Sequence, residues 1–180
     1  RQISEKVGVG GLTGKIPTFE NMHKLKRLEL RSNKLTGSIP SNFLKNVDAK
    51  SFMFADLSRN FLSGALPESF ASLPGYIYIE DNRITDISAA CDSSGLKQNS
   101  TNQNNLMQLV QMFGCDSLLC KPGTYNSFGR RESYDSPCKK CQITENLKYF
   151  GSIDCIAGNE GGGEVDSTQY TMRPTKFKNT

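Results

Sequence analysis

Apolar residues recur through the first half of this 180-residue chain in one repeated pattern, LxxLxLxxNxL followed by (T/S)GxIP. A complete copy starts at Leu25 and a second at Phe52, while a half copy from Ile77 and a degenerate copy ending at Pro17 flank them. The positions equivalent to the Asn of the pattern are separated by 23, 27 and 22 residues. Because this period is typical of solenoids with one short strand per coil, the pattern predicts about four coils over residues 1–90.

Within each copy, apolar and polar residues alternate with the period of a β-strand. Leu28 and Leu30 should face the interior, where neighbouring coils cover them, and the residues between them should face outward. The outward residues of successive strands should form columns on the concave face, and aromatic residues beside arginine are typical of interaction hot spots. We therefore expect a binding surface there, the alternatives being ordinary exposed residues or tyrosines packed under a cap. The candidate residues are Arg27, Phe54 and Tyr76, then Glu29, Asp56 and Tyr78, then Arg31, Ser58 and Glu80.

The asparagines of the pattern, Asn33, Asn60 and Asn82, are predicted to be structural. An asparagine after the strand can bond backbone groups that a sharp turn leaves unpaired, and stacked coils extend these bonds into a ladder. In the degenerate first copy Gly10 takes this position. Gly37 and its equivalents in the GxIP half are predicted to form a tight turn.

The stretch LKRLELRSNKLTGSIPSNF resembles the plant-specific subclass of leucine-rich repeats, which occurs in receptor-kinase ectodomains and polygalacturonase-inhibiting proteins. This resemblance covers residues 1–90. It implies a leucine-rich repeat solenoid with short parallel strands and a mostly irregular or 3-10 convex side. It also implies extracellular recognition through the concave sheet or its flank.

An amphipathic helix is predicted after the repeats. Leu106, Leu109, Val110 and Phe113 fall on one helical face, and Gly114 suits the position just past the helix end. Because a solenoid must cover the apolar end of its last coil, we expect residues 91–119 to form a carboxyl-terminal cap. The alternative is a helix that binds a partner, with Met107 and Met112 as contacts.

All six cysteines follow the third strand of the pattern, which favours disulfides and an oxidising compartment. The stretch CKPGTYNSFGRRESYDSPCKKC resembles the cysteine-rich modules of ephrin-receptor-like regions. The resemblance covers residues 115–155, and we expect the module itself over residues 120–155. Repeats followed by such a module resemble secreted or surface proteins of diatoms and related algae. Of the fifteen possible pairings we expect Cys91–Cys115, Cys120–Cys138 and Cys141–Cys155. The alternative is a zinc ribbon, because Cys115, Cys120, Cys138 and Cys141 have almost the required spacing.

Other motifs carry less information. Asn99 begins an N-glycosylation sequon, which fits secretion, and residues 156–180 have the composition of a flexible tail or linker. His23 is the single histidine, so the sequence offers little basis for nucleophilic catalysis, and we expect no enzyme activity, cofactor or metal. The net charge of +4 is spread over interspersed signs, which disfavours nucleic-acid binding, and no apolar run could span a bilayer.

Two classes of function fit these features. The first is a non-enzymatic extracellular or cell-surface recognition module that binds a protein, peptide or glycan. The second is a structural subunit of an extracellular matrix, cell wall or filament. The first nine residues offer neither a cysteine pair nor an amphipathic segment as a cap, so we expect further repeats or a neighbouring subunit to cover that edge.

Overall fold

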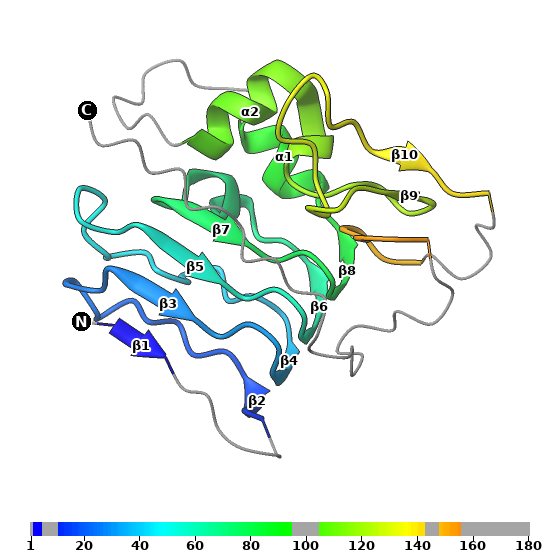
Figure 1. Ribbon diagram of the computed structural model, residues 1–180. Coiled ribbons are helices and arrows are strands. Elements are labelled where there is room, and N and C mark those ends of the chain that lie inside the picture. The colour runs from blue at the N-terminus through cyan, green and yellow to red at the C-terminus, as the bar shows by residue number, and fades with distance from the viewer. Residues whose placement is uncertain (1, 5–10, 95–104, 143–147, 156–180) are drawn as a thin grey trace.

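The computed structural model describes residues 2–4, 11–94, 105–142 and 148–155. The chain forms a parallel β-solenoid with two four-stranded sheets (Figure 1). We call them the front sheet and the flank sheet. The front sheet contains β1 (Gln2–Ser4), β3 (Arg27–Glu29), β5 (Phe54–Asp56) and β7 (Tyr76–Tyr78), and the flank sheet contains β2 (Thr13–Lys15), β4 (Lys34–Gly37), β6 (Phe61–Ala65) and β8 (Arg83–Asp86).

The front sheet follows the alternation in the sequence. Its strands pair in parallel with the central residues Leu28, Ala55 and Ile77 in line, and all three side chains are buried. In β3, β5 and β7 the flanking residues point away from the core and are partly exposed. The prediction of a leucine-rich repeat solenoid is therefore confirmed at the level of the fold.

The flank sheet was not expected. The sequence predicts a tight turn at Gly37 and its equivalents, whereas the structure places Gly37 and Gly64 within strands that pair with neighbouring coils. Both glycines have positive φ angles, 81° and 85°, which an L side chain adopts only with strain. The glycines thus bend each coil while the adjoining residues continue the backbone pairing.

Between β3 and β4, between β5 and β6, and between β7 and β8, the chain turns through a residue in the left-handed region followed by a buried asparagine. Ser32, Arg59 and Asp81 have φ angles of 55–57° and directly precede Asn33, Asn60 and Asn82. Each asparagine amide donates to the carbonyl three residues earlier, and its oxygen accepts a backbone N–H from a neighbouring coil. Asn60 and Asn82 also donate to the coil before them, so the bonds run from coil to coil.

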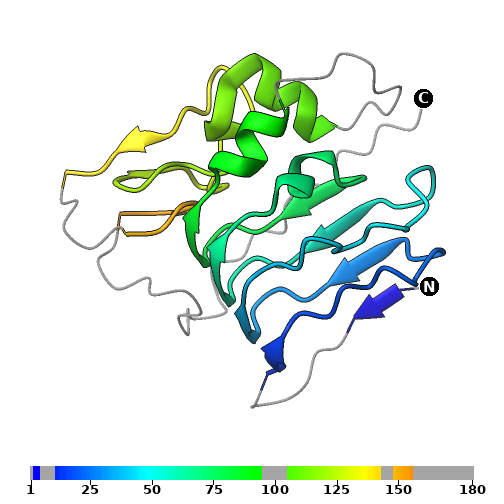
Figure 2. The same cartoon turned by 180° about the vertical axis from the view of Figure 1, so that it is seen from behind.

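Helices cover the carboxyl-terminal end of the solenoid (Figure 2). The short 3-10 helix η1 (Glu68–Ser72) packs against α1 (Ser88–Ser94), and α2 (Asn105–Phe113) lies beside them. The sequence pattern does not predict helix α1. Leu106 and Val110 of α2 are buried in the common core, so this face of the helix packs against the solenoid. The 3-10 helix η2 (Gly114–Ser117) follows at once, with Gly114 at a φ of 70°.

Three disulfides link the carboxyl-terminal region. They join Cys91 to Cys115, Cys120 to Cys138 and Cys141 to Cys155, the pairs expected from the sequence. The first ties α1 to η2, and the other two hold a small module around the antiparallel pair β9 (Thr124–Tyr125) and β10 (Lys139–Lys140).

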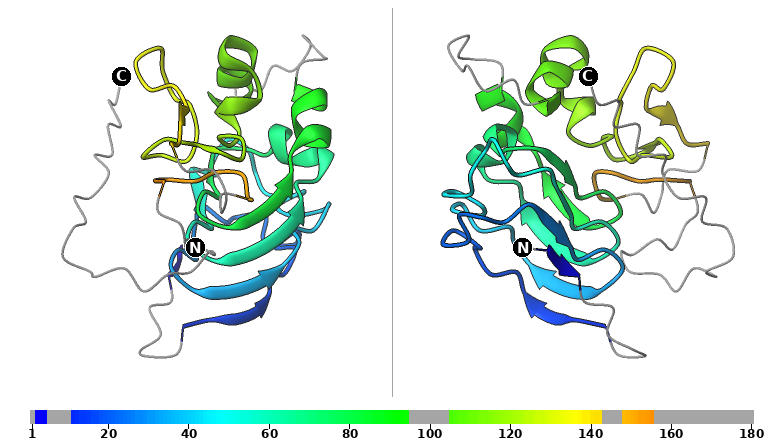
Figure 3. Two further views of the ribbon diagram at one scale, coloured as in Figure 1. Left: turned by 90° about the vertical axis from the view of Figure 1, so that its right-hand side faces the viewer. Right: turned by 60° about the vertical axis from the view of Figure 1, so that its left-hand side comes forward.

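The cysteine-rich module lies directly against the last coil (Figure 3). The amide of Asp81 donates to the carbonyl of Gly151, and the amide of Phe150 donates to the carbonyl of Ile84. Close packing at Gly129 and Gly151 leaves no room for a Cβ atom at either position. The module and helix α2 together form the carboxyl-terminal cap. Gly10, Asn99 and residues 156–180 lie outside the described residues.

Candidate functional site

The front sheet brings the expected columns into register. Arg27 pairs with Phe54 and Phe54 with Tyr76, while Glu29, Asp56 and Tyr78 form the neighbouring column. All six side chains are partly exposed. The strands therefore present aromatic and charged groups side by side on one face, which we call the front face.

Contacts between neighbouring strands hold these side chains in place. The guanidinium of Arg27 lies 5.7 Å from the centre of the Phe54 ring, and the rings of Phe54 and Tyr78 meet edge to face at 6.4 Å. Arg31 and Asp56 form an ion pair at 3.7 Å. A surface fixed by its own contacts loses less side-chain entropy when a partner binds.

Two residues of the expected binding face are not accessible, and for them the prediction is wrong. Ser58 is 1% exposed, because it lies in the turn after β5 and its hydroxyl and amide both donate to the Asp56 carboxylate. Glu80 is 3% exposed, because Gly129 and Gly151 of the cysteine-rich module pack against it. Neither side chain can meet a partner at the surface.

The turn after β7 buries a second carboxylate beside Glu80. Asp81 is 8% exposed and forms an ion pair with Arg59 at 3.8 Å. Burial raises the pKa of Asp81, since the charged form loses its water, and the nearby acidic residues Asp154 and Glu80 act in the same direction against Arg59. Glu80 and Asp81 are adjacent acidic residues, yet both side chains are buried and neither belongs to a solvated charged face.

The raised pKa of Asp81 predicts a specific dependence of stability on pH. The folded state holds the Asp81 proton more tightly than the unfolded state, whose pKa is about 3.9. The contribution of Asp81 to the free energy of unfolding should therefore fall as the pH rises above about 4. In Asp81→Asn this term is absent, so the melting temperature of the variant relative to the wild type should increase from pH 4 to neutrality.

Asp135→Asn, at an exposed position, serves as the control for the removal of one carboxylate. Asparagine also tolerates the positive φ of position 81, so the substitution adds little backbone strain. A difference between Asp81→Asn and the wild type that does not change with pH would contradict the prediction. Thermal denaturation at a series of pH values measures it.

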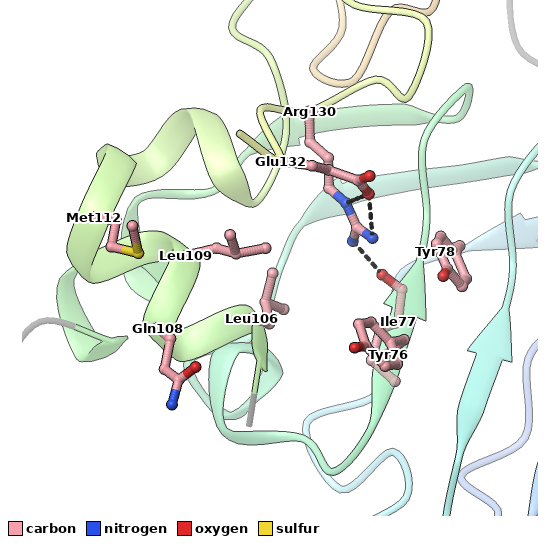
Figure 4. A pocket seen from close by; sticks show the side chains of 9 residues that line it. All are labelled: Tyr76, Ile77, Tyr78, Leu106, Gln108, Leu109, Met112, Arg130 and Glu132. Carbon is pink, nitrogen blue, oxygen red and sulfur yellow. Dashed lines mark hydrogen bonds and ion pairs between the residues drawn. The ribbon is translucent and has the colours of Figure 1, made fainter. Parts of the chain in front are cut away.

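A pocket that the sequence did not reveal lies where α2 crosses the end of the front face (Figure 4). Its volume is about 320 Å³. Leu106, Leu109 and Met112 of α2 face Tyr76 and neighbouring residues of β7, and Figure 4 labels the full lining. In the sequence only the apolar face of α2 indicates this pocket. The opposite wall comes from β7, a strand about 30 residues earlier in the chain.

Arg130 and Glu132 of the cysteine-rich module close the pocket at its upper end in Figure 4. Arg130 is 4% exposed, and its guanidinium donates to the carbonyl of Ile77 at 2.7 Å and to the Glu132 carboxylate at 3.0 Å. It also lies 4.9 Å from the centre of the Tyr78 ring. Arginine, carboxylate and strand therefore form one neutral, well-bonded wall.

The cysteines leave no set of thiolates for zinc. A zinc ribbon would need Cys115, Cys120, Cys138 and Cys141 as free ligands, whereas each is part of a disulfide. Within the described ranges, no group of three or more His, Cys, Asp or Glu side chains is placed to hold a metal ion. His23 is exposed, and its Nδ1 lies 2.9 Å from the carbonyl of Asn46. Among the helices that the structure describes, none has the length and apolar character needed to span a bilayer.

Comparison with protein families identifies the repeats. Residues 24–46 and 53–73 match the family model described as Leucine Rich Repeat. The first segment includes β3 and β4, and the second runs from β5 to η1. Together with the fold, the match shows that the chain contains leucine-rich repeats, and a disulfide-rich carboxyl-terminal region follows them. No curated protein matches the chain significantly.

Proposed function

We propose that the chain is a non-enzymatic extracellular recognition module, which binds a protein, peptide or glycan through the front face. The observation that carries the proposal is the row of partly exposed aromatic and charged side chains that the strand register aligns. Leucine-rich repeat solenoids are typically interaction scaffolds, because stacked strands offer an extended surface. Tyrosine, phenylalanine and arginine are enriched where partners bind.

Three disulfides support an extracellular location, since such bonds persist in oxidising compartments. The LTGSIP signature and the CKPGTY module agree with it, as both resemble parts of secreted and cell-surface proteins. We assign the repeats to the plant-type subclass and the module to the ephrin-receptor-like class on this resemblance.

Two matched charge reversals on one coil test the proposal. Arg27 lies on the front face, whereas the exposed Lys34 lies on β4 of the flank sheet. Arg27→Glu and Lys34→Glu make the same change in net charge on different sheets. With extracellular extract of the source organism, wild type and Lys34→Glu should capture the same partner, and Arg27→Glu should lose it by about tenfold or more.

Equal capture by both variants would contradict a role for the front face. Removal of glycans from the extract separates a sugar ligand from a protein one. Sedimentation of the purified protein examines the alternative, a structural subunit of an extracellular matrix, cell wall or filament. Self-association that Arg27→Glu abolishes, with no other partner captured, would favour this alternative.

A further inference from the structure

The pocket at the end of the front face has an apolar floor and aromatic sides. Leu106 and Ile77 form the floor and are 4% and 1% exposed. Tyr76 and Tyr78 of β7 stand along one side, and Met112 of α2 stands opposite them (Figure 4). Rings and a thioether sulfur make favourable contacts with an aromatic group that lies between them.

The charged wall of the pocket is already neutralised. Arg130 bonds to Glu132 and to the carbonyl of Ile77, and it stacks on Tyr78. A charged ligand would meet Arg130 and Glu132 already paired with each other, and it would lose its hydration on entering the pocket, which is costly. An uncharged group fits the pocket better than an acidic or basic one.

Exposed apolar side chains cluster beside this pocket. Among the described residues, the large apolar side chains that are exposed are Met112 and Tyr134, at 57% and 71%. Tyr134 packs edge to face on Phe113 at 4.9 Å, and the guanidinium of Arg131 lies 4.5 Å from the Phe113 ring centre. Apolar groups held at the surface by such contacts are characteristic of interfaces.

Size and position indicate what enters the pocket. A volume of about 320 Å³ is at the lower end of the range for small-molecule sites, which suits one large side chain. Tyr76 and Tyr78 belong both to the pocket and to the front face. A protein that lies along the front face would therefore reach the pocket with a single residue.

We propose that the pocket binds an uncharged aromatic side chain, of tyrosine or tryptophan type, from a protein partner that lies across the front face. This inference rests on the proposed function and specifies the chemistry of its partner. The aromatic ring lies between Tyr76 and Met112 over Leu106. The polar end of the ring stays at the mouth of the pocket, where Gln108 is exposed.

Small analogues of side chains test this inference without a known partner. The methyl group of each methionine is labelled with ¹³C, and the protein is titrated with p-cresol, indole or methyl glucoside. Met112 reports on the pocket, and Met22 and Met53 of the solenoid report on unspecific effects. p-Cresol or indole should shift the Met112 signal saturably, with a dissociation constant on the order of 1 mM for a ligand of this size.

Two variants on one helix provide the comparison. Leu109→Lys places a charge in the pocket, and Gln111→Lys places it on an exposed position of α2 outside the lining. The first should weaken binding about tenfold or more, and the second should leave it unchanged. Met112→Lys gives a second test, because the position is exposed and should tolerate the change. Since this variant lacks the Met112 methyl group, binding of p-cresol is measured by saturation transfer from the protein.

The inference is overturned if the aromatic analogues do not saturate, if Met22 and Met53 respond equally, or if methyl glucoside binds more tightly. It is also overturned if Gln111→Lys and Leu109→Lys have the same effect. These outcomes are distinct from failure of the proposed function. Loss of partner capture in Arg27→Glu without aromatic binding would retain the front face as a binding surface and reject the pocket as its anchor.

Discussion

Replacement of Asn60 by aspartate should lower the free energy of unfolding by about 3–5 kcal/mol and the melting temperature by roughly 10 °C. The side chain is fully buried. Its amide nitrogen lies 2.9–3.2 Å from the carbonyls of Leu30, Leu57 and Ser58, and its oxygen accepts the amide of Leu35. A carboxylate keeps the acceptor, but it places a second oxygen against three carbonyl oxygens and buries a charge.

The Asn60→Asp variant should also show a characteristic pH dependence. Burial raises the pKa of the new carboxyl in the folded state, and its neutral form can donate one hydrogen bond. The loss of stability should thus be largest at neutral pH and should shrink as the pH falls through the folded pKa. Asn46→Asp, at an exposed position in the preceding coil, should have little effect. Equal melting temperatures for the two variants would rule out the ladder as a source of stability.

Gly129→Ala should separate the cysteine-rich module from the last coil. A Cβ atom at Gly129 would overlap the side chain of Glu80 and lie 2.7 Å from the carbonyl oxygen of Gly151. The φ of 65° adds strain for any L side chain. The obstructing atoms are the Cβ of Glu80 and a backbone carbonyl, which cannot move aside as the end of a flexible side chain can. We therefore expect the free energy of unfolding to fall by about 3 kcal/mol or more. Hydrogen exchange should accelerate at the amide of Asp81, which donates to Gly151.

Gly114→Ala is the matched control for this substitution. Its φ of 70° is almost the same, but no atom lies within 4 Å of the position that a Cβ would take. It should cost only the backbone strain, about 1–2 kcal/mol, and should leave exchange at Asp81 unchanged. If the two alanine variants had equal effects, tight packing at Gly129 would not hold the module in place.

The front sheet could be predicted because its signal is local. Leu28 and Leu30 alternate with Arg27 and Glu29, and each copy of the pattern repeats the alternation. A strand that buries every second residue against equivalent strands of the next coils can be predicted from its own residues. The apolar stripe of α2 was visible for the same reason.

The flank sheet does not follow from the sequence, because the same residues indicate a turn and also pair as a strand. Gly37 in the stretch LTGSIP suggests a turn, and its positive φ agrees with that interpretation. The backbone of β4 nevertheless pairs with both adjoining coils, where Thr36 lies opposite Lys15 and Gly37 lies opposite Leu62. Identical distortions in successive coils keep their hydrogen bonds in register, and a single copy of the sequence does not show this.

The candidate site was predicted only in part, because residues far along the chain bury Glu80 and form one wall of the pocket. The register of Arg27, Phe54 and Tyr76 followed from the repeat, but the burial of Glu80 depends on a module about 50 residues further along. The contact from Arg130 to the carbonyl of Ile77 likewise spans 53 residues. Nothing in the local pattern around Arg130 marks it as a residue that inserts against a strand.

The bond from Arg130 to Ile77 has a consequence for assembly. Tyr76 and Tyr78 pair with β5, so the carbonyl of Ile77 points to the opposite side, where a further strand would otherwise attach. Arg130 occupies that acceptor. A fibre that grows by pairing strands edge to edge needs two complementary open sheet edges on every copy. In this protein Arg130 covers the acceptor at the β7 edge of the front sheet.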